Sequence, residues 1–276
     1  MRMLLLAALL PLAGVASAAP PAVAGLRLYA ANCGEIAFEN LSFFSDTGDY
    51  DGRPGRLVVP CYVIRHPKGT LLWDAGLGDS YVGKPGTLGP GVTVKVATSL
   101  VDELKAIGLA PADFSYVAFS HLHADHTGNA NLFPAATWIL NQTELAAAIN
   151  VPPPFGVNAA TFSGYAQAKQ QLIDGDYDVF GDGTVRILRA PGHTPGHQVL
   201  VLKFRKAGNV ILSGDLYHLR DSVANHRMPV INVSRADTLA SMERVDRLVA
   251  NLKARLVVEH DLGDFNSLPR FPAYLD

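Results

Sequence analysis

The chain is short of charge. Only 17% of its 276 residues are charged, the formal net charge is −2, and no long run of one sign occurs. Nucleic acids and anionic membrane surfaces are bound through basic stripes, so neither partner is expected. With 49% hydrophobic residues, the chain instead has enough apolar material for one globular domain with a large core. A homodimer and a small-molecule substrate remain compatible with this composition.

Cysteine is also scarce, with Cys33 and Cys61 as the only two. They lack the C-x-x-C spacing of a zinc or redox site, and both lie in expected strands. The sequence leaves a disulfide and two buried free thiols equally open, because it does not give the geometry that a bridge requires.

Long hydrophobic runs are absent except at the N-terminus. The apolar stretch at residues 3–15 follows a basic residue and precedes a small-x-small motif ending at Ala18, which is typical of a signal peptide. The stretch has about 13 residues, whereas a membrane-spanning helix needs roughly 20. We therefore expect a signal peptide over residues 1–18, cleaved after Ala18. The mature chain, residues 19–276, is then a single periplasmic or secreted domain that does not bind the membrane.

Apolar periodicity and turn residues divide the mature chain into runs of strands followed by helices. This order favours an α/β fold with two sheets packed face to face and helices outside. Two Gly- or Pro-rich stretches are expected to be irregular: a substrate-facing loop at 76–91 and an insert at 151–164. Strands are expected at residues 26–31, 57–65, 70–74, 116–120, 137–141, 185–188, 198–204, 209–213 and 255–259, and helices at 97–107, 143–149 and 235–252.

One short segment holds four potential metal ligands. The pattern H-x-H-x-D-H follows the expected strand at 116–120 and supplies His121, His123, Asp125 and His126. Imidazole and carboxylate are the ligands expected of a divalent transition metal such as zinc. Because four such groups are costly to bury without a metal, we expect this segment to bind one.

Further ligands must come from elsewhere, because the cluster is too compact to close one tetrahedral site. His193, Asp215 and His260 each follow an expected strand. Strand ends that converge on one rim commonly build the sites of layered α/β enzymes. Two metals roughly 3.5–4 Å apart can share a hydroxide that attacks a carbonyl or phosphoryl centre.

These motifs occur in the order found in the metallo-β-lactamase superfamily, which the sequence resembles from about residue 26 to the C-terminus. The resemblance implies a four-layer αβ/βα sandwich with two mixed β-sheets, helices outside and two metal ions at one edge. Zinc is expected, although an all-N/O site also admits iron, cobalt or manganese. The resemblance assigns His121, His123 and His193 to the first metal, Asp125, His126 and His260 to the second, and Asp215 to both.

Within the superfamily, the sequence most resembles the N-acyl-homoserine lactone lactonases, which implies a hydrolase that opens the lactone ring and quenches quorum sensing. Those enzymes often carry a tyrosine three residues after the bridging aspartate. Here His218 takes that position and Tyr217 precedes it. Either residue is expected to assist catalysis beside Asp125 and Asp215. The alternative is a packed tyrosine and an exposed histidine.

The substrate-binding residues are less sharply indicated. Phe43, Phe44 and Phe155 are expected to line an apolar groove for an acyl chain, although Phe43 and Phe44 fit a core equally well. The alternative functions are a related hydrolase of organophosphate triesters or β-lactams, and a metal-binding or sensing protein without catalysis. Asp215 argues against a β-lactamase, because lactamases with this motif generally lack a bridging aspartate.

Four other residues have weaker assignments. Asp74 is expected either to orient a ligating histidine or to cap a turn. His197 is expected to be structural, and His66 and His226 are expected in a turn and at the surface.

Overall fold

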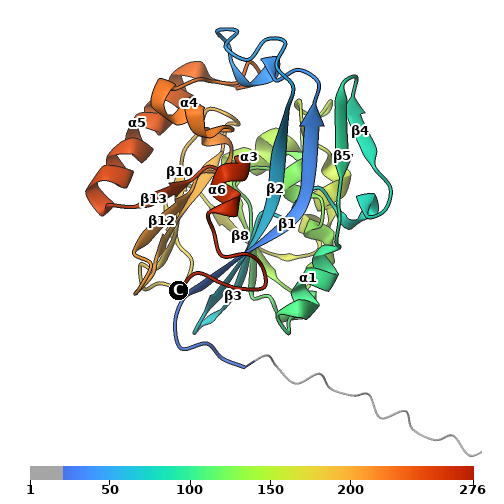
Figure 1. The fold of residues 1–276 in the computed structure, drawn as a ribbon. Coiled ribbons are helices and arrows are strands. Elements are labelled where there is room, and N and C mark those ends of the chain that lie inside the picture. The colour runs from blue at the N-terminus through green and yellow to red at the C-terminus, as the bar shows by residue number, and fades with distance from the viewer. Residues whose placement is uncertain (1–20) are drawn as a thin grey trace, which may run out of the picture.

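A computed structural model describes residues 21–276 of the chain (Figure 1). The expected signal peptide and its cleavage site after Ala18 lie outside the described residues. Among the helices of the described part, none combines the length and the apolar character that crossing a membrane requires.

Two mixed β-sheets form the centre of the molecule. The larger has eight strands in the order β4-β5-β1-β2-β3-β6-β7-β8 and the smaller has five in the order β13-β12-β11-β10-β9. The strands of the larger sheet are β1 (Arg27–Phe38), β2 (Gly55–His66), β3 (Gly69–Trp73), β4 (Gly86–Gly89), β5 (Val92–Lys95), β6 (Tyr116–Ala118), β7 (Thr137–Asn141) and β8 (Lys169–Ile173). Those of the smaller sheet are β9 (Tyr177–Asp178), β10 (Val185–Arg189), β11 (Gln198–Lys203), β12 (Asn209–Leu212) and β13 (Arg255–Val257).

Helices cover the outer faces of both sheets, so the four-layer sandwich is confirmed. Leu104 of α1 and Leu145 of α3 belong to the core on the larger sheet, and Met242 of α5 to the core on the smaller one (Figure 1). The helices are α1 (Leu100–Ala106), α2 (Ala124–Thr127), α3 (Gln142–Ala148), α4 (Arg220–Asn225), α5 (Arg235–Leu252) and α6 (Leu262–Asn266).

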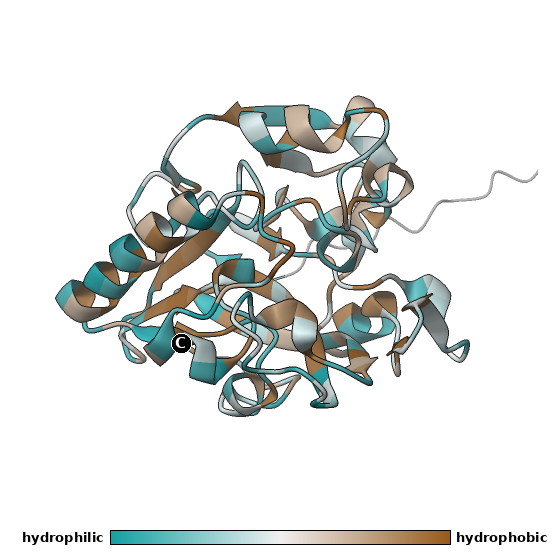
Figure 2. Ribbon diagram, turned by 90° about the horizontal axis from the view of Figure 1, so that it is seen from above, coloured by the Kyte–Doolittle hydropathy of each residue, from teal (hydrophilic) through white to brown (hydrophobic). Residues whose placement is uncertain are grey.

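A third core fills the space between the sheets. Trp73 and Ile139 of the larger sheet pack in one cluster with Leu200 and Leu212 of the smaller, all fully buried. Strands buried on both faces read as continuous apolar runs, and Figure 2 shows hydrophobic strands between helices of mixed character. This packing fixes the two sheets against each other and thereby sets the positions of the strand ends.

The expected strands and helices are found, those at 137–141 and 235–252 with the expected ends and the others with shifted ends, and β2 and β3 form a hairpin. The prediction of an irregular loop at 76–91 was wrong in its last part, where β4 pairs with β5. The sequence reading also missed β8, α4 and α6. These elements are short, and β4 and β8 are largely exposed edge strands, so their sequences lack the alternation of a half-buried strand.

The two cysteines form a disulfide, with 5.7 Å between their Cα atoms, that joins β1 to β2. Gly76 lies against it: a Cβ on Gly76 would be 2.3 Å from the Cβ of Cys33 and 3.0 Å from Sγ of Cys61. The same turn holds the metal-ligand segment, because the Ala75 N–H donates to the His126 carbonyl at 2.7 Å. The disulfide therefore supports the turn on which α2 rests.

Candidate metal centre

Strand ends deliver all seven predicted ligands to one edge of the sandwich. β6 leads into His121 and His123, and α2 carries Asp125 and His126. The other three, His193, Asp215 and His260, follow β10, β12 and β13. The seven side chains fall into two groups of close ligand atoms, His121, His123, His193 and Asp215 in one and Asp125, His126 and His260 in the other.

The spacing of nitrogens fits a common metal ion in each group. Nδ1 of His123 is 3.2 Å from Nε2 of His193, and Nε2 of His126 is 3.2 Å from Nε2 of His260. Two nitrogens each 2.0–2.1 Å from a tetrahedral zinc are about 3.3 Å apart. Buried Nε2 of His121 has no hydrogen-bond partner in the described chain. The residues present therefore fit two metal ions.

Asp215 lies between the two groups with one oxygen facing each. Its Oδ1 is 3.0 Å from Nε2 of His260 and 3.2 Å from Nε2 of His126. Its Oδ2 is 3.3 Å from Nε2 of His193. Burial opposes ionisation of this carboxyl, yet the surrounding imidazoles, His260 foremost, hold the pKa of Asp215 well below its usual range. A carboxylate in this position would bridge two cations.

The balance of buried charge also calls for cations. Asp125 and Asp215 make ion pairs only with histidines in the described part of the chain. Burial opposes protonation of His126, but the nearby carboxylates outweigh it and raise the pKa of His126 well above its usual range. Bound cations would supply the positive charge that a proton supplies here.

The histidines of the first group are ready to bind metal as neutral bases. Burial lowers the pKa of His123 and of His193 to about 3. Burial also lowers the pKa of His121 well below its usual range. Because a metal binds the unprotonated nitrogen, these shifts remove competition from protons at neutral pH.

The second ring nitrogen of most ligands is held by an oxygen behind the site. Nδ1 of His260 is 2.7 Å from the Val58 carbonyl and Nδ1 of His193 is 2.8 Å from Oδ1 of Asn232. Nδ1 of His126 is 3.2 Å from Oδ2 of Asp74. Such contacts fix the tautomer and the direction of a ligating imidazole.

Two buried residues hold backbone segments in place. His197 accepts a hydrogen bond from the Asp215 N–H at 2.9 Å, so it positions the bridging residue from behind, as the expected structural role requires. Asp74 accepts from the Ser120 N–H at 2.7 Å while facing His126, which places it both at a turn and behind a ligand. Its own φ of 56° lies in the left-handed region.

Sequence comparison matches residues 54–260 to the family model of the metallo-beta-lactamase superfamily, a range that includes all seven ligands. The chain belongs to this superfamily. It is 30% identical over 263 residues to the N-acyl homoserine lactonase AttM of Azorhizobium caulinodans, covering 91% of this chain and 99% of that protein. It is 29% identical over 232 residues to the N-acyl homoserine lactonase AiiA of Bacillus thuringiensis subsp. kurstaki, covering 80% and 90%.

Structural comparison agrees with the superfamily assignment. A solved N-acyl homoserine lactone hydrolase, with the product N-hexanoyl-L-homoserine bound at its catalytic metal center, matches the chain with a TM-score of 0.80. The two chains are 26% identical, and the match covers 90% of this chain and 98% of the other.

The side chains of Tyr217 and His218 point to opposite sides of the backbone. Tyr217 is fully buried in the core beneath α5, and its hydroxyl donates to Oδ1 of Asp246 at 2.9 Å. It does not contact the ligands, so the expectation that Tyr217 could reach the site is wrong. His218 does face the centre, with Nε2 2.9 Å from Oδ2 of Asp215.

His218 is not placed as an exposed substrate donor. The residue is 3% exposed, its ring lies 5.0 Å from that of Phe44, and its Nδ1 is buried without a partner in the described chain. Its Nε2 faces Asp215 instead of an open groove. The alternative of an exposed histidine is therefore wrong, and a role of His218 in catalysis stays a prediction.

The three predicted substrate-contacting phenylalanines differ in exposure. Phe44 is buried against Phe38 and His218, so it is a core residue and not part of an open groove. Phe43 and Phe155 are 41% and 67% exposed. The insert that carries Phe155 lies on the first group of ligands, because a Cβ on Gly156 would be 2.7–2.9 Å from the His123 ring.

Residues behind the site were missed by sequence reasoning, Asn232 and Glu259 among them. Asn232 supports His193, and Glu259 lies fully buried with Oε1 3.6 Å from Nδ1 of His126. Burial and the carboxylate of Asp74 raise the pKa of Glu259 well above its usual range. The position of Glu259 directly before His260 was the only available signal.

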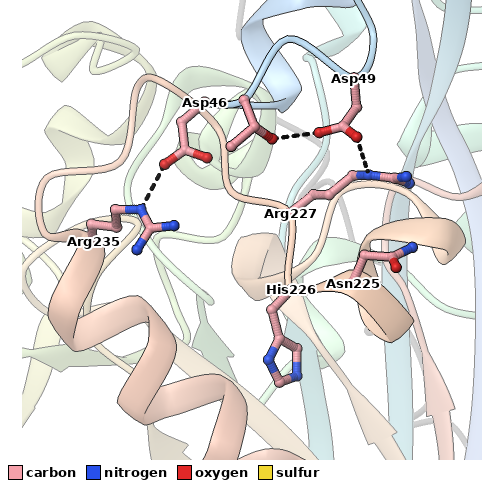
Figure 3. A pocket seen from close by; sticks show the side chains of 7 residues that line it. Asp46, Asp49, Asn225, His226, Arg227 and Arg235 are labelled. Atoms are coloured by element: carbon pink, nitrogen blue, oxygen red, sulfur yellow. Dashed lines mark hydrogen bonds and ion pairs between the residues drawn. The ribbon is translucent and has the colours of Figure 1, made fainter.

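A polar pocket of about 190 Å³ contains none of the seven ligands (Figure 3). Its arginines are already paired: Arg235 with Asp46 at 2.7 Å and Arg227 with Asp49 at 3.2 Å. The pairs fasten the segment between α4 and α5, which includes Asn232. The pocket is lined by Asp46, Thr47, Asp49, Asn225, His226, Arg227 and Arg235.

The two remaining histidines each lie against an aspartate. His226 is half-exposed and lies 2.8 Å from Oδ2 of Asp246, as a surface residue can. His66 was expected in an exposed turn, but it is buried, stacks on Phe180 and lies 2.9 Å from Asp182. Stacking on an aromatic ring explains this burial.

Proposed function

We propose that this protein opens the lactone ring of N-acyl homoserine lactones with two bound metal ions, zinc by preference. The match to N-acyl homoserine lactonases along nearly their whole length supports this substrate class. Nitrogen and carboxylate ligands without a thiolate suit zinc, and also iron, cobalt or manganese.

The observation that carries the proposal is the apolar surface on both sides of the first group of ligands. On the His193 side, the Val233 N–H donates to the His193 carbonyl and the Val230 N–H to that of Phe43. Val230 and Val233 are 56% and 62% exposed. On the His123 side lies the insert with exposed Phe155. A substrate with a polar head and an apolar chain would place its head at the metals and its chain on this surface.

The protein's own residues would position the metals and leave one side of the site open to the substrate. Bound metals would supply an activated water and polarise the substrate carbonyl. Asp215 holds both ligand groups in register, and the buried histidines keep their directions through their second nitrogens. The side chain of Asp125 is 20% exposed, which makes it the ligand most open to an entering substrate.

We expect the purified protein to contain about two metal ions per chain and to lose lactone hydrolysis after exhaustive chelation. Adding zinc back should restore it, because the seven ligands remain in place. The measurement is metal analysis together with a turnover panel of N-acyl homoserine lactones, a carbapenem and paraoxon. One ion or fewer in an active preparation would contradict the two-metal site. No turnover of any panel member would indicate a metal-binding protein without catalysis.

We also propose export to the periplasm or the medium with removal of residues 1–18. The disulfide supports this location, because such bridges form and persist in oxidising compartments. The intact mass of the exported protein should correspond to a chain that begins at Ala19 and is two hydrogens lighter than its reduced form. A mass that includes residues 1–18 would contradict cleavage.

A further inference from the structure

A buried carboxylate links the two chain segments that supply the histidines of the first metal group. Glu144 lies in the first turn of α3 and is 4% exposed. Its Oε1 accepts from the Leu122 N–H and its Oε2 from the Gly196 N–H, both at 2.9 Å. Leu122 separates the ligands His121 and His123, and Gly196 follows the ligand His193 by three residues.

These contacts are not those of an ordinary helix cap. Asn141 caps α3, and its side chain accepts from the Glu144 N–H at 3.0 Å. A glutamate at this position of a helix commonly turns back to the N–H of the capping residue. The Glu144 carboxylate instead leaves the helix for residues 22 and 52 positions away in the sequence. Hydrogen bonds from N–H groups to an ionised carboxylate are stronger than those between neutral groups.

The fit around this carboxylate is tight. A Cβ on Gly196 would be 2.4 Å from the Glu144 nitrogen and 2.4 Å from Oδ1 of Asn141, so the turn can approach α3 only as glycine. The next residues continue the junction: the Gln198 N–H donates to the Ser120 carbonyl at 2.8 Å. The segments around His121 and His193 are thus held together at two successive points.

We propose that Glu144 is a positioning residue that sets the geometry of the first metal group, and so its metal affinity. The inference rests on the two-metal part of the proposed function and not on the lactone substrate. Glu144 does not contact the second group through these bonds, because Asp125, His126 and His260 are carried by α2 and the end of β13. Removing its carboxylate should therefore affect the two groups unequally.

The test is a titration of the metal-free protein with zinc in competition with a chromophoric chelator. Glu144→Gln keeps one acceptor, which can still bind one of the two backbone N–H groups. It turns its NH₂ group toward the other N–H, so that the NH₂ group and that N–H are both left without an acceptor. We expect the dissociation constant of the first group to rise about 10- to 100-fold, the range typical for loss of a partner behind a ligand. The second group should be unchanged. His123→Ala and His260→Ala identify which binding phase belongs to which group.

Asp113→Asn is the matched control. Its carboxylate also accepts a backbone N–H, that of Ala110 at 2.7 Å, but it lies before β6, away from the ligands. The control should bind zinc like the unaltered protein.

If Glu144→Gln does not fold, Glu144→Asp keeps the charge with a shorter reach and should show the same selective loss. Equal weakening of both groups, or none, would overturn the proposal. Because the zinc titration involves no substrate, its result could still be interpreted if the protein did not hydrolyse lactones.

Discussion

Asp215→Asn is expected to lower kcat/KM for lactone hydrolysis by more than about 100-fold. Loss of a residue that only hydrogen-bonds a metal ligand typically costs roughly 10- to 100-fold, and Asp215 is itself a candidate ligand. An amide carries no negative charge and offers a single good acceptor, whereas Asp215 faces a different histidine group with each oxygen. The second metal should bind more weakly for the same reason. Steady-state kinetics at saturating metal, with metal analysis of the same samples, measures both effects.

Two controls separate the bridging role from general damage. His197→Ala removes the acceptor of the Asp215 N–H but leaves the carboxylate, so its loss of activity should be much smaller. Asp178→Asn makes the same chemical change at a carboxylate that accepts from Gly181 and Gly183, and it should retain full activity. Similar specific activities for Asp215→Asn and His197→Ala at full metal occupancy would show that the ligand assignment is wrong.

His218→Ala should lower kcat about 10- to 100-fold, since it removes the imidazole whose Nε2 lies 2.9 Å from Oδ2 of Asp215. KM should change little, because the buried ring does not reach the exposed apolar surface. His218→Gln retains an N–H donor and should recover part of the loss. Kinetics at saturating metal, with the metal content checked, make the comparison.

Tyr217→Phe is the matched partner of this experiment. It removes only a hydrogen bond to Asp246, so its kcat should stay near that of the unaltered protein. A large loss in Tyr217→Phe together with little loss in His218→Ala would reverse the assignment of the two residues.

The seven ligands could be predicted because each is marked by its position in the sequence. Four lie in the six-residue segment 121–126, which follows β6. His193, Asp215 and His260 each follow a strand of the smaller sheet. Strand ends in a layered fold share an edge, so residues distant in sequence meet there. The order of these motifs was enough to indicate both the fold and the two-metal site.

The orientation of Tyr217 and His218 could not be predicted, because it depends on how the strand ends. β12 stops at Leu212, and the 3-10 helix Gly214–Leu216 follows. The backbone is extended again at Tyr217, with φ −135° and ψ 134°, so the side chains of Tyr217 and His218 point to opposite sides, His218 toward Asp215 and Tyr217 toward α5. A β-strand continued for a few more residues would have reversed this arrangement.

Buried carboxylates behind the site were also hidden from the sequence. Glu144 lies in a run that reads as an ordinary helix start, and Glu259 in one that reads as the end of a strand. Their partners are backbone groups and histidines far away in the sequence. No local pattern distinguishes such residues from solvated surface glutamates.

The disulfide connects the redox chemistry of the protein to its metal binding. Cys33 and Cys61 pack against Gly76, and the neighbouring Ala75 holds the backbone of His126. Thermodynamic linkage is reciprocal: if reduction of the bridge weakens the metal at His126, metal binding must make the bridge harder to reduce by the same free energy. Under that coupling, a chelation experiment on this protein should keep the disulfide oxidised, and a reduction experiment should hold the metal content fixed.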